Sequence, residues 1–436
     1  MITVPVVLLA AGESTRFWPL REKNVFLFFG KPLLEWHYEQ LVRLGVKKCI
    51  VVANSNNFEM IKHIEVPKGL QAEFVKQQGE GQGEAVKAVH AVYKEGPALI
   101  INASDVYTDE MIESLIKANQ KDPKNMYIGT IEKDQYFPGG YVVTNDKGEV
   151  TKIVEKPGER NIPSNIIRIV ADMIPNIQQL NTTLEKKKYS ASCGYEDAMT
   201  DMMKSGMKCF VKKTTQWSCL KYPWHVQDVM EHLLRGIEKP HIHASVKIAE
   251  NATIIGNVWI EAGAKIMEGV KIVGPCYIGK NAVIGNNSMV RESMIGDNVI
   301  TGFNTDITRS FIGNNSWFHS NFIGDSVIGN NVSMGSGTVL ANLRLDEGEI
   351  SSIVKKEKIN TRRNKLGVVI GNDVRIGVNC SIMPGVKIGS YSFIGAGIVV
   401  AEDVEEKMFV RGSAKLVIEK NTKTLPENRD AFRKKI

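Results

Sequence analysis

Isoleucine recurs every six residues over two long stretches of this 436-residue chain. The first stretch is strict over eight positions: Ile242, Ile248, Ile254, Ile260, Ile266, Ile272, Ile278 and Ile284. The period resumes at Ile370, Ile376, Ile382, Ile388 and Ile394, and small or β-branched residues commonly stand two places earlier. A period of six matches neither an α-helix nor an amphipathic hairpin. It predicts a left-handed parallel β-helix, in which each hexad forms a short strand and a turn and the isoleucines of successive coils stack inside.

The residues around this repeat place its ends and an interruption. Glycine and asparagine follow many of the isoleucines, and both tolerate the positive φ of a sharp corner. The period loosens around Ile295, Ile312 and Ile328 and is lost in a basic segment. We therefore expect a β-helix over residues 239–413, with an inserted loop at 343–367 and a basic C-terminal tail at 414–436.

The first half of the chain, residues 1–238, alternates apolar strands with amphipathic helices. The expected strands are Val4–Ala10, Cys49–Ala53, Ala98–Asn102, Met126–Ile131 and Gly140–Val143. The expected helices are Leu33–Leu44, Glu84–Lys94 and Asp109–Ala118. This alternation predicts a doubly wound α/β domain with a mainly parallel sheet. Ligands bind such sheets outside the carboxyl ends of the strands, which here means the loops after Ala11 and Asn102.

Composition narrows the class of protein further. The net charge of +7 suits acidic ligands, but it is spread along the chain, so we expect no nucleic-acid partner. Six scattered cysteines without a CxxC pair favour reduced thiols and a cytoplasmic location. The apolar start Val4–Ala11 has no basic region before it, and no apolar run reaches the 18 residues or so of a membrane span. We expect a protein that works without a membrane.

The segment Val7–Arg16 is a strand that leads into a turn of small residues. The backbone amides of such a turn can hold a phosphate group. Arg16 and, further on, Lys23 would supply positive charge for a phosphate that gains negative charge during transfer. By residue chemistry alone, the turn fits plain packing as well as function.

The order of several motifs resembles the sugar-1-phosphate nucleotidylyltransferases. These motifs are Leu-Ala-Ala-Gly-x-x-Thr-Arg ending at Arg16, Phe-Gly-Lys-Pro-Leu ending at Leu33, Ser104-Asp105 and Val-Glu-Lys-Pro ending at Pro157. Joined to a hexapeptide β-helix, the chain is most similar to the bifunctional N-acetylglucosamine-1-phosphate uridylyltransferase/glucosamine-1-phosphate acetyltransferase family, including its archaeal members. The resemblance implies transfer from a nucleoside triphosphate to a sugar-1-phosphate, with Mg2+, giving UDP-N-acetylglucosamine and pyrophosphate.

The resemblance also implies roles for individual residues. It assigns the phosphate-loop arginine to Arg16 and the catalytic lysine to Lys23, and it assigns Mg2+ to Asp105. It places nucleotide and sugar contacts at Ala11, Gly12, Gln78, Gly83, Gly140 and Glu155.

Five positions depart from the family pattern in this half: Ser14, Glu22, Glu84, Ser104 and Cys219. The residue Ser14 replaces a glycine of the phosphate loop, and Glu22 could pair with Lys23 and reduce its charge. Cys219 stands where the family carries a second magnesium ligand, and a neutral thiol is a poor ligand for this ion. Loss of the nucleotidyl activity is therefore an open alternative.

In the second half, the resemblance makes His319 the base of an acetyl transfer from acetyl-CoA. It implies that Asn342 contacts substrate, that Arg363 and Lys365 meet phosphate groups, and that the chain forms a homotrimer. Phe322 stands where the family has a tyrosine.

Two further hypotheses therefore stand beside the bifunctional enzyme. One is a trimeric acetyltransferase with an inactive first domain. The other is a nucleotidylyltransferase whose β-helix serves only for assembly.

Overall fold

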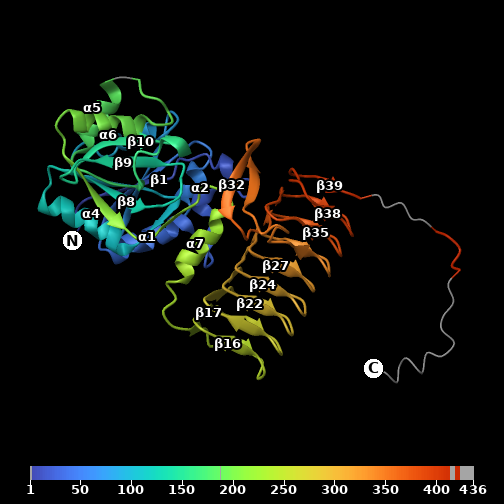
Figure 1. Ribbon diagram of the computed structural model, residues 1–436. Coiled ribbons are helices and arrows are strands. Elements are labelled where there is room, and N and C mark those ends of the chain that lie inside the picture. Colours follow the sequence, from blue (N-terminus) through green and yellow to red (C-terminus); the bar gives the residue numbers. More distant parts are fainter. Residues whose placement is uncertain (1, 187, 413–417, 423–436) are drawn as a thin grey trace.

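The computed structural model describes residues 2–186, 188–412 and 418–422. An α/β domain, coloured blue to green, lies beside a β-helix coloured yellow to red (Figure 1). Within the described residues, no helix is long and apolar enough to cross a membrane. Apart from residues 418–422, the expected basic tail at 414–436 lies outside the described residues.

The sheet of the α/β domain has β1 (Val6–Leu9) at its centre, between β4 (Lys48–Ala53) and β6 (Ala98–Asn102). These strands and β5 (Gln71–Lys76) are parallel. The long strand β11 (Ile166–Ile174) runs antiparallel to β6 and joins it to the remaining strands. These are β8 (Met126–Glu132), β9 (Gly140–Thr144), β10 (Val150–Glu155) and β12 (Cys209–Thr214). The expectation of a mainly parallel sheet fails in this part, where β11 is antiparallel to β6, β8 and β9, and the short turn between β9 and β10 makes that pair antiparallel as well.

Helices cover both faces of this sheet, as a doubly wound domain requires. Val6 and Leu8 face α1 (Leu33–Arg43) and α4 (Asp109–Lys121). Val7 and Leu9 face the other layer, formed by α3 (Gln82–Val89), α5 (Ile177–Lys186) and α6 (Gly194–Lys204). The two-residue alternation of β1 therefore supplies both halves of the core. The helix expected at Glu84–Lys94 ends at Val89, because tight turns follow it.

Shorter elements connect these parts. They are η1 (Thr15–Phe17), η2 (Lys23–Val25), β2 (Leu27–Phe28), β3 (Lys31–Pro32), α2 (Phe58–Lys62), β7 (Asp105–Tyr107), η3 (Glu159–Asn161), β13 (Trp217–Cys219) and α7 (His225–Leu234).

The β-helix consists of parallel strands that form three faces, here named A, B and C. Face A contains β14 (His241–Ile242), β17 (Val258–Ile260), β20 (Cys276–Ile278), β23 (Met294–Ile295), β25 (Phe311–Ile312), β28 (Val327–Ile328), β33 (Val369–Ile370) and β36 (Lys387–Ile388). Face B contains β15 (Lys247–Ile248), β18 (Lys265–Ile266), β21 (Val283–Ile284), β26 (Trp317–Phe318), β29 (Ser333–Met334), β34 (Arg375–Ile376), β37 (Phe393–Ile394) and β39 (Phe409–Val410). Face C contains β16 (Thr253–Ile255), β19 (Lys271–Val273), β22 (Met289–Arg291), β24 (Asp306–Thr308), β27 (Phe322–Gly324), β30 (Val339–Leu340), β35 (Ser381–Ile382) and β38 (Val399–Val400).

The isoleucines of the repeat form one continuous core inside these faces, from Ile260 to Ile394. Ile242 and Ile248, at the start of the stack, are each 41% exposed because no coil lies beyond them. The predicted corner conformation is present as well. Gly263 and Asn281 have φ values of 75° and 55° at successive corners.

The period loosens in the middle of the β-helix because the coils are shorter there. Stacked partners lie 18 residues apart at Trp259 and Tyr277, 17 at Tyr277 and Met294, and 16 at Phe311 and Val327. Asn and Asp side chains at the corners join these coils. Asp297, Asn314, Asn330 and Asn372 each accept a hydrogen bond of 2.7–2.8 Å from a backbone N–H of the preceding coil. Hydrogen bonds between coils thus hold the register where the hexad is lost.

Face A carries one column of outward-pointing apolar side chains, one from each of six successive coils. The column contains Trp259, Tyr277, Met294, Phe311, Val327 and Val369. These side chains pack against Phe17, Phe26, Phe28 and Phe29 of the α/β domain and against α7. The ring centres of Phe26 and Phe311 are 4.9 Å apart. This aromatic contact joins the two domains.

The segment expected as an inserted loop at 343–367 contains an antiparallel hairpin, β31 (Ile350–Val354) and β32 (Glu357–Arg363). The hairpin leaves the β-helix and lies beside the α/β domain (Figure 1). Ile350, Val354 and Leu366 pack against Trp224. The segment is therefore docked against the first domain.

We predict that Phe311→Ala destabilises the contact between the domains. The side chain is 5% exposed and would leave a cavity among aromatic rings, so the free energy of unfolding should fall by about 3 kcal/mol. Urea unfolding would measure this change, with Phe311→Leu as the matched control, which should cost under about 1.5 kcal/mol. Equal stabilities of the two variants would contradict the packing described here.

Candidate functional site

Two adjoining pockets open at the carboxyl ends of β1 and β6. One has a volume of about 330 Å³ and the other about 1130 Å³. Their linings share Arg16, Lys23, Asn102 and Lys156, so the two pockets form one continuous cleft. This is the place where ligands bind a doubly wound sheet.

The turn after β1 lines the larger pocket with Ala11, Gly12, Ser14 and Arg16. Asparagine side chains hold the backbone carbonyls at the start of this turn. Asn57 Nδ2 donates to the Ala10 carbonyl at 2.9 Å, and Asn54 Nδ2 donates to the Ala11 carbonyl at 3.0 Å. These two hydrogen bonds thus fix the turn through its backbone carbonyls. Ser14 adopts a left-handed conformation with φ 55°, as the glycine it replaces would do without strain.

Lys23 lies at the junction of the two pockets. Burial, with the nearby Arg16 charge, lowers the pKa of Lys23 to about 8. The Glu22 carboxylate is held by Asn24 Nδ2 at 2.8 Å and by Asn57 Nδ2 at 3.2 Å rather than by the ammonium group of Lys23. The sequence suggested that Glu22 pairs with Lys23, but the Glu22 carboxylate bonds to the two asparagines instead.

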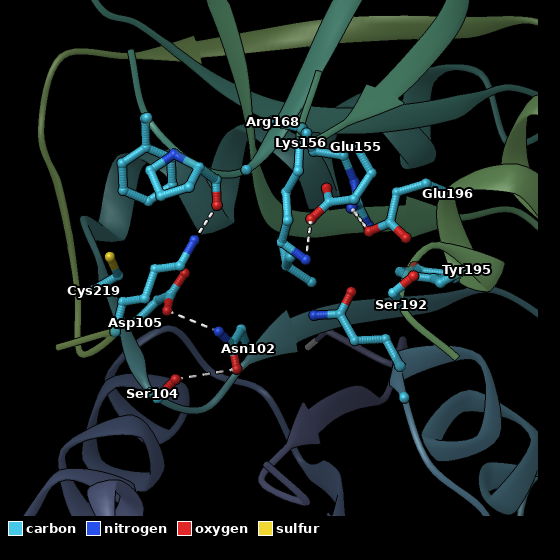
Figure 2. Close-up of a pocket in the computed structure, with 18 of the residues that line it drawn as sticks. Asn102, Ser104, Asp105, Glu155, Lys156, Arg168, Ser192, Tyr195, Glu196 and Cys219 are labelled. Atoms are coloured by element: carbon cyan, nitrogen blue, oxygen red, sulfur yellow. Dashed lines mark hydrogen bonds and ion pairs between the residues drawn. The ribbon is translucent and has the colours of Figure 1, made fainter. Parts of the chain in front are cut away.

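Asp105 begins β7 and is 4% exposed. Its Oδ1 accepts a hydrogen bond from Asn102 Nδ2 at 2.8 Å, and its Oδ2 accepts one from Trp217 Nε1 at 3.1 Å. Figure 2 shows Asn102 and Asp105 joined in this way on the wall of the pocket. Burial raises the pKa of Asp105 to about 7, although its hydrogen bond from Trp217 and the charge of Lys23 act in the opposite direction.

Cys219 lies directly opposite Asp105 in the antiparallel pair of β7 and β13. Burial, with the Asp105 charge, raises the pKa of the Cys219 thiol, which stays neutral and does not suit a hard cation. No cluster of three or more His, Cys, Asp or Glu side chains suited to a metal occurs in the part of the chain that the structure describes. Magnesium can, however, be held by one carboxylate together with substrate phosphates and water. Asp105 meets that requirement.

The smaller pocket continues past Gly140 and Glu155 to a buried charged network. A Cβ on residue 140 would lie 3.1 Å from Glu155 Oε2, so glycine leaves room for this carboxylate. Arg168 donates to Asp172 at 3.0 Å and to Glu196 at 2.7 Å. Figure 2 shows Glu155, Lys156, Arg168 and Glu196 grouped on one side of the pocket, across from Asp105.

Gln78 and Gly83, both expected to contact the nucleotide, lie in different surroundings. Gln78 lines the larger pocket and is exposed. Gly83 lies in the first turn of α3, where an added Cβ would be 3.3 Å from Leu184. Its position therefore supports the packing of α3 against α5.

Several residues of the cleft were missed by the sequence analysis. Lys221 lines the smaller pocket, and burial together with the Arg16 charge lowers the pKa of its ammonium group to about 8. Asn102 and Trp217 hold Asp105, and Arg168 lies beneath the pocket. Trp217 and Lys221 each lie two residues from Cys219, which departs from the family pattern. That departure was the signal that could have pointed to them. Arg168 gave no local signal.

The β-helix places His319 and Asn342 at opposite edges of face C, one before and one after its strands. His319 is an exposed corner residue between β26 and β27, and its ring stacks on Trp317 with the ring centres 6.3 Å apart. Asn342 follows β30 and donates to Asp325 Oδ2 at 2.5 Å, beyond the other end of β27. One chain therefore does not bring the two expected site residues together.

Arg363 and Lys365 lie at the base of the hairpin. Arg363 forms an ion pair with Asp228 of α7 and donates to Gln227 Oε1 at 2.9 Å. These bonds attach the hairpin to α7. Lys365 is exposed.

Comparison with known proteins agrees with both halves of the fold. Residues 5–217 match the nucleotidyl transferase family, and residues 257–292 and 367–401 match the bacterial transferase hexapeptide family of six repeats. The chain is thus a transferase with an α/β nucleotidyltransferase domain and a left-handed β-helix, which confirms the expected fold class. A solved structure of apo UDP-glucose pyrophosphorylase aligns with 50% of this chain and 93% of its own, at 18% identity and a TM-score of 0.44.

Two relatives match nearly the whole chain. The bifunctional protein GlmU of Methanococcus vannielii is 30% identical over 95% of this chain and 99% of its own length. The bifunctional sugar-1-phosphate nucleotidylyltransferase/acetyltransferase of Sulfurisphaera tokodaii is 32% identical, with 91% and 97% covered. The chain belongs to this family of bifunctional sugar-1-phosphate nucleotidylyltransferase/acetyltransferases, as the motif order predicted.

We predict that His37 makes the fold sensitive to mild acid. His37 Nε2 lies 3.1 Å from the Ala103 carbonyl and supports the loop that leads to Asp105. Burial lowers the pKa of His37 to about 4, below its value of about 6.5 in an unfolded chain. The unfolded state therefore binds the proton more tightly, so this contribution is complete above pH 6.5 or so and is lost as the pH falls toward 4.

For His37 alone, this linkage amounts to about 2 kcal/mol between pH 8 and pH 5. Urea unfolding of the wild type and of His37→Gln at both pH values would test it, because glutamine keeps a donor for the Ala103 carbonyl but does not titrate. The variant should lose less stability on acidification than the wild type. An identical pH dependence of the two proteins would rule out this role of His37.

Proposed function

We propose that the α/β domain transfers a nucleotidyl group from a nucleoside triphosphate to a sugar-1-phosphate. The observation that carries this proposal is the convergence of Arg16, Lys23 and Asp105 on one cleft at the carboxyl ends of β1 and β6. The relatives' names favour a sugar-1-phosphate as acceptor. UTP and N-acetylglucosamine-1-phosphate are the substrates we propose, giving UDP-N-acetylglucosamine.

In the proposed reaction, a phosphate oxygen of the sugar-1-phosphate attacks the α-phosphorus of the triphosphate. The bond to the β-phosphate breaks, and pyrophosphate leaves. Arg16 and protonated Lys23 offset the negative charge that develops. With a pKa of about 8, Lys23 is charged at neutral pH. Ala11, Gly12 and Gln78 line the larger pocket, which we propose as the nucleotide side of the cleft. Gly83 lines neither of the two pockets and would act through the packing of α3.

We propose that Asp105 holds magnesium together with phosphate oxygens. When bound, the ion polarises the reacting phosphate and neutralises charge. The Asp105 carboxylate is ready for this role because Asn102 and Trp217 orient it. Gly140 and Glu155 form the sugar side, where a carboxylate can accept hydrogen bonds from hydroxyl groups.

For the β-helix we propose acetyl transfer from acetyl-CoA to the amino group of glucosamine-1-phosphate. The amine attacks the thioester carbon and His319 accepts the proton that the amine loses; the carbon–sulfur bond then breaks, and the thiolate of coenzyme A leaves and takes up that proton. Because His319 and Asn342 lie at opposite edges of face C, one site would need the two residues from neighbouring copies of the chain. The exposed Lys365 would be available to bind a phosphate group. Arg363 would first have to leave Asp228.

The exposed side chains on the uncovered part of the β-helix support assembly into a homotrimer. Trp317, Phe393, Phe409 and Val399 are 55%, 51%, 60% and 67% exposed. All six cysteines are free thiols, which suits the proposed cytoplasmic location.

A second candidate is an acetyltransferase whose first domain no longer transfers nucleotides. The neutral thiol of Cys219 opposite Asp105 favours it, because the β7–β13 pair then offers a cation one carboxylate only. The third hypothesis, a nucleotidylyltransferase with the β-helix as scaffold, rests on Phe322, which has no hydroxyl group to offer a substrate.

We predict that the wild type releases pyrophosphate from UTP with N-acetylglucosamine-1-phosphate and magnesium, and that Asp105→Asn lowers this rate at least about 100-fold. Asp146→Asn, an exposed carboxylate in the turn between β9 and β10, is the control and should act as the wild type. Parallel assays with dTTP, GTP, ATP and CTP would identify the base. No release with any of these nucleotides from folded protein would favour the acetyltransferase alone.

We predict that His319→Ala slows acetylation of glucosamine-1-phosphate by about 100-fold or more, because the amine loses its base. His243→Ala, which changes another exposed histidine of the β-helix, should keep the wild-type rate. Thiol release from acetyl-CoA measures both. Full activity of His319→Ala would exclude it as the base.

A further inference from the structure

The hairpin of the β-helix reaches the cleft of the other domain. Lys355, at its tip, lines the larger pocket together with Gly12, Ser14, Arg16 and Lys23. Residues far apart in the sequence and from different domains thus share one wall. The comparisons assign no role to this part of the chain.

Several contacts hold the hairpin in this place. Arg362 pairs with Glu159 of the α/β domain at 2.6 Å, and Arg363 pairs with Asp228 of α7. Val354, next to Lys355, packs against Trp224. These contacts near the base of the hairpin therefore fix the position of its tip.

A buried lysine of β36, on face A, links the hairpin to the segment that follows the phosphate-loop turn. Lys387 is 1% exposed, and its Nζ donates to Ser352 of β31 at 3.0 Å and to Asp403 at 2.5 Å. The same ammonium group lies over the ring of Trp18, 5.5 Å from its centre, shortly after the turn that carries Arg16. The hairpin consequently docks beside the segment expected to hold phosphate.

The turn itself is unusual. Val354 pairs with Glu357, so Lys355 and Lys356 form a two-residue loop, with φ values of 50° and 68°. Loops of this kind strongly prefer Asn-Gly, because other side chains are disfavoured at positive φ. Two lysines here keep positive charge at the tip at a conformational cost. Strain of this kind, retained where it faces a cleft, suggests function.

We infer that Lys355 binds the β- and γ-phosphates of the nucleoside triphosphate, so that the β-helix supplies part of the nucleotide site of its own chain. This inference rests on the proposed nucleotidyl transfer. With Arg16, Lys23 and Lys156, Lys355 makes four cations around the larger pocket, against the carboxylates of Glu13 and Glu80. A polyanion such as a triphosphate suits this balance.

Lys355→Gly and Lys356→Gly form a matched pair of variants. Glycine relieves the positive φ in both, and each removes one charge from the same turn, so loss of folding would not separate them. Of the two lysines, both of which the structure describes, Lys355 alone lines the pocket. Calorimetric titration with UTP, with UMP and with inorganic tripolyphosphate would compare them with the wild type.

We expect Lys355→Gly to weaken UTP binding about three- to tenfold, as loss of one exposed cation beside an anion should do. Lys356→Gly should stay within about twofold, UMP binding should be unchanged, and the difference should shrink at 0.5 M or so of salt.

Equal UTP affinity of the Lys355→Gly variant and the wild type would overturn the role of Lys355 and leave the proposed function standing. Equal weakening in both variants would also overturn it. If the wild type binds neither UTP nor tripolyphosphate, both the proposed function and the role of Lys355 are wrong.

Discussion

The aromatic column on face A and the phenylalanines of the α/β domain form the contact on which the rest of the molecule depends. By covering face A, this contact leaves faces B and C free, and His319 lies at the corner between them. It also brings Trp18 against Lys387 and the hairpin against Trp224. Hydrophobic burial at a distance from either site therefore decides which surfaces are available for chemistry.

Three charged groups of the cleft have pKa values close to neutral pH. Burial brings the pKa values of Lys23 and Lys221 down to about 8 and that of Asp105 up to about 7. A bound triphosphate would add negative charge beside the lysines and favour their protonated forms. The cleft can therefore adjust its charge to its ligand, which a set of fully exposed groups would do far less.

The sequence predicted the coils well because the isoleucine period is a local signal repeated many times. Arg16, Lys23 and Asp105 were predicted through the resemblance of the motif order to a known family, and the structure brings all three to one cleft. Lys221 was missed because it follows β13, whose pairing with β7 joins segments far apart in the chain. The column from Trp259 to Val369 was readable in principle, one residue before every third isoleucine. The sequence pattern does not say what covers this column, because the covering residues come from the other domain and are brought there by folding.

The helix α7 belongs to the first half of the chain in sequence but packs against the column of face A. Arg363 fastens the hairpin to the same helix through Asp228. In the evolution of such chains, exchange of the β-helix for another would leave α7 and Phe28 without their partner surface. The two halves are therefore not interchangeable modules: a change in the outward residues of one coil must be matched by a change in the helix and loop that cover it.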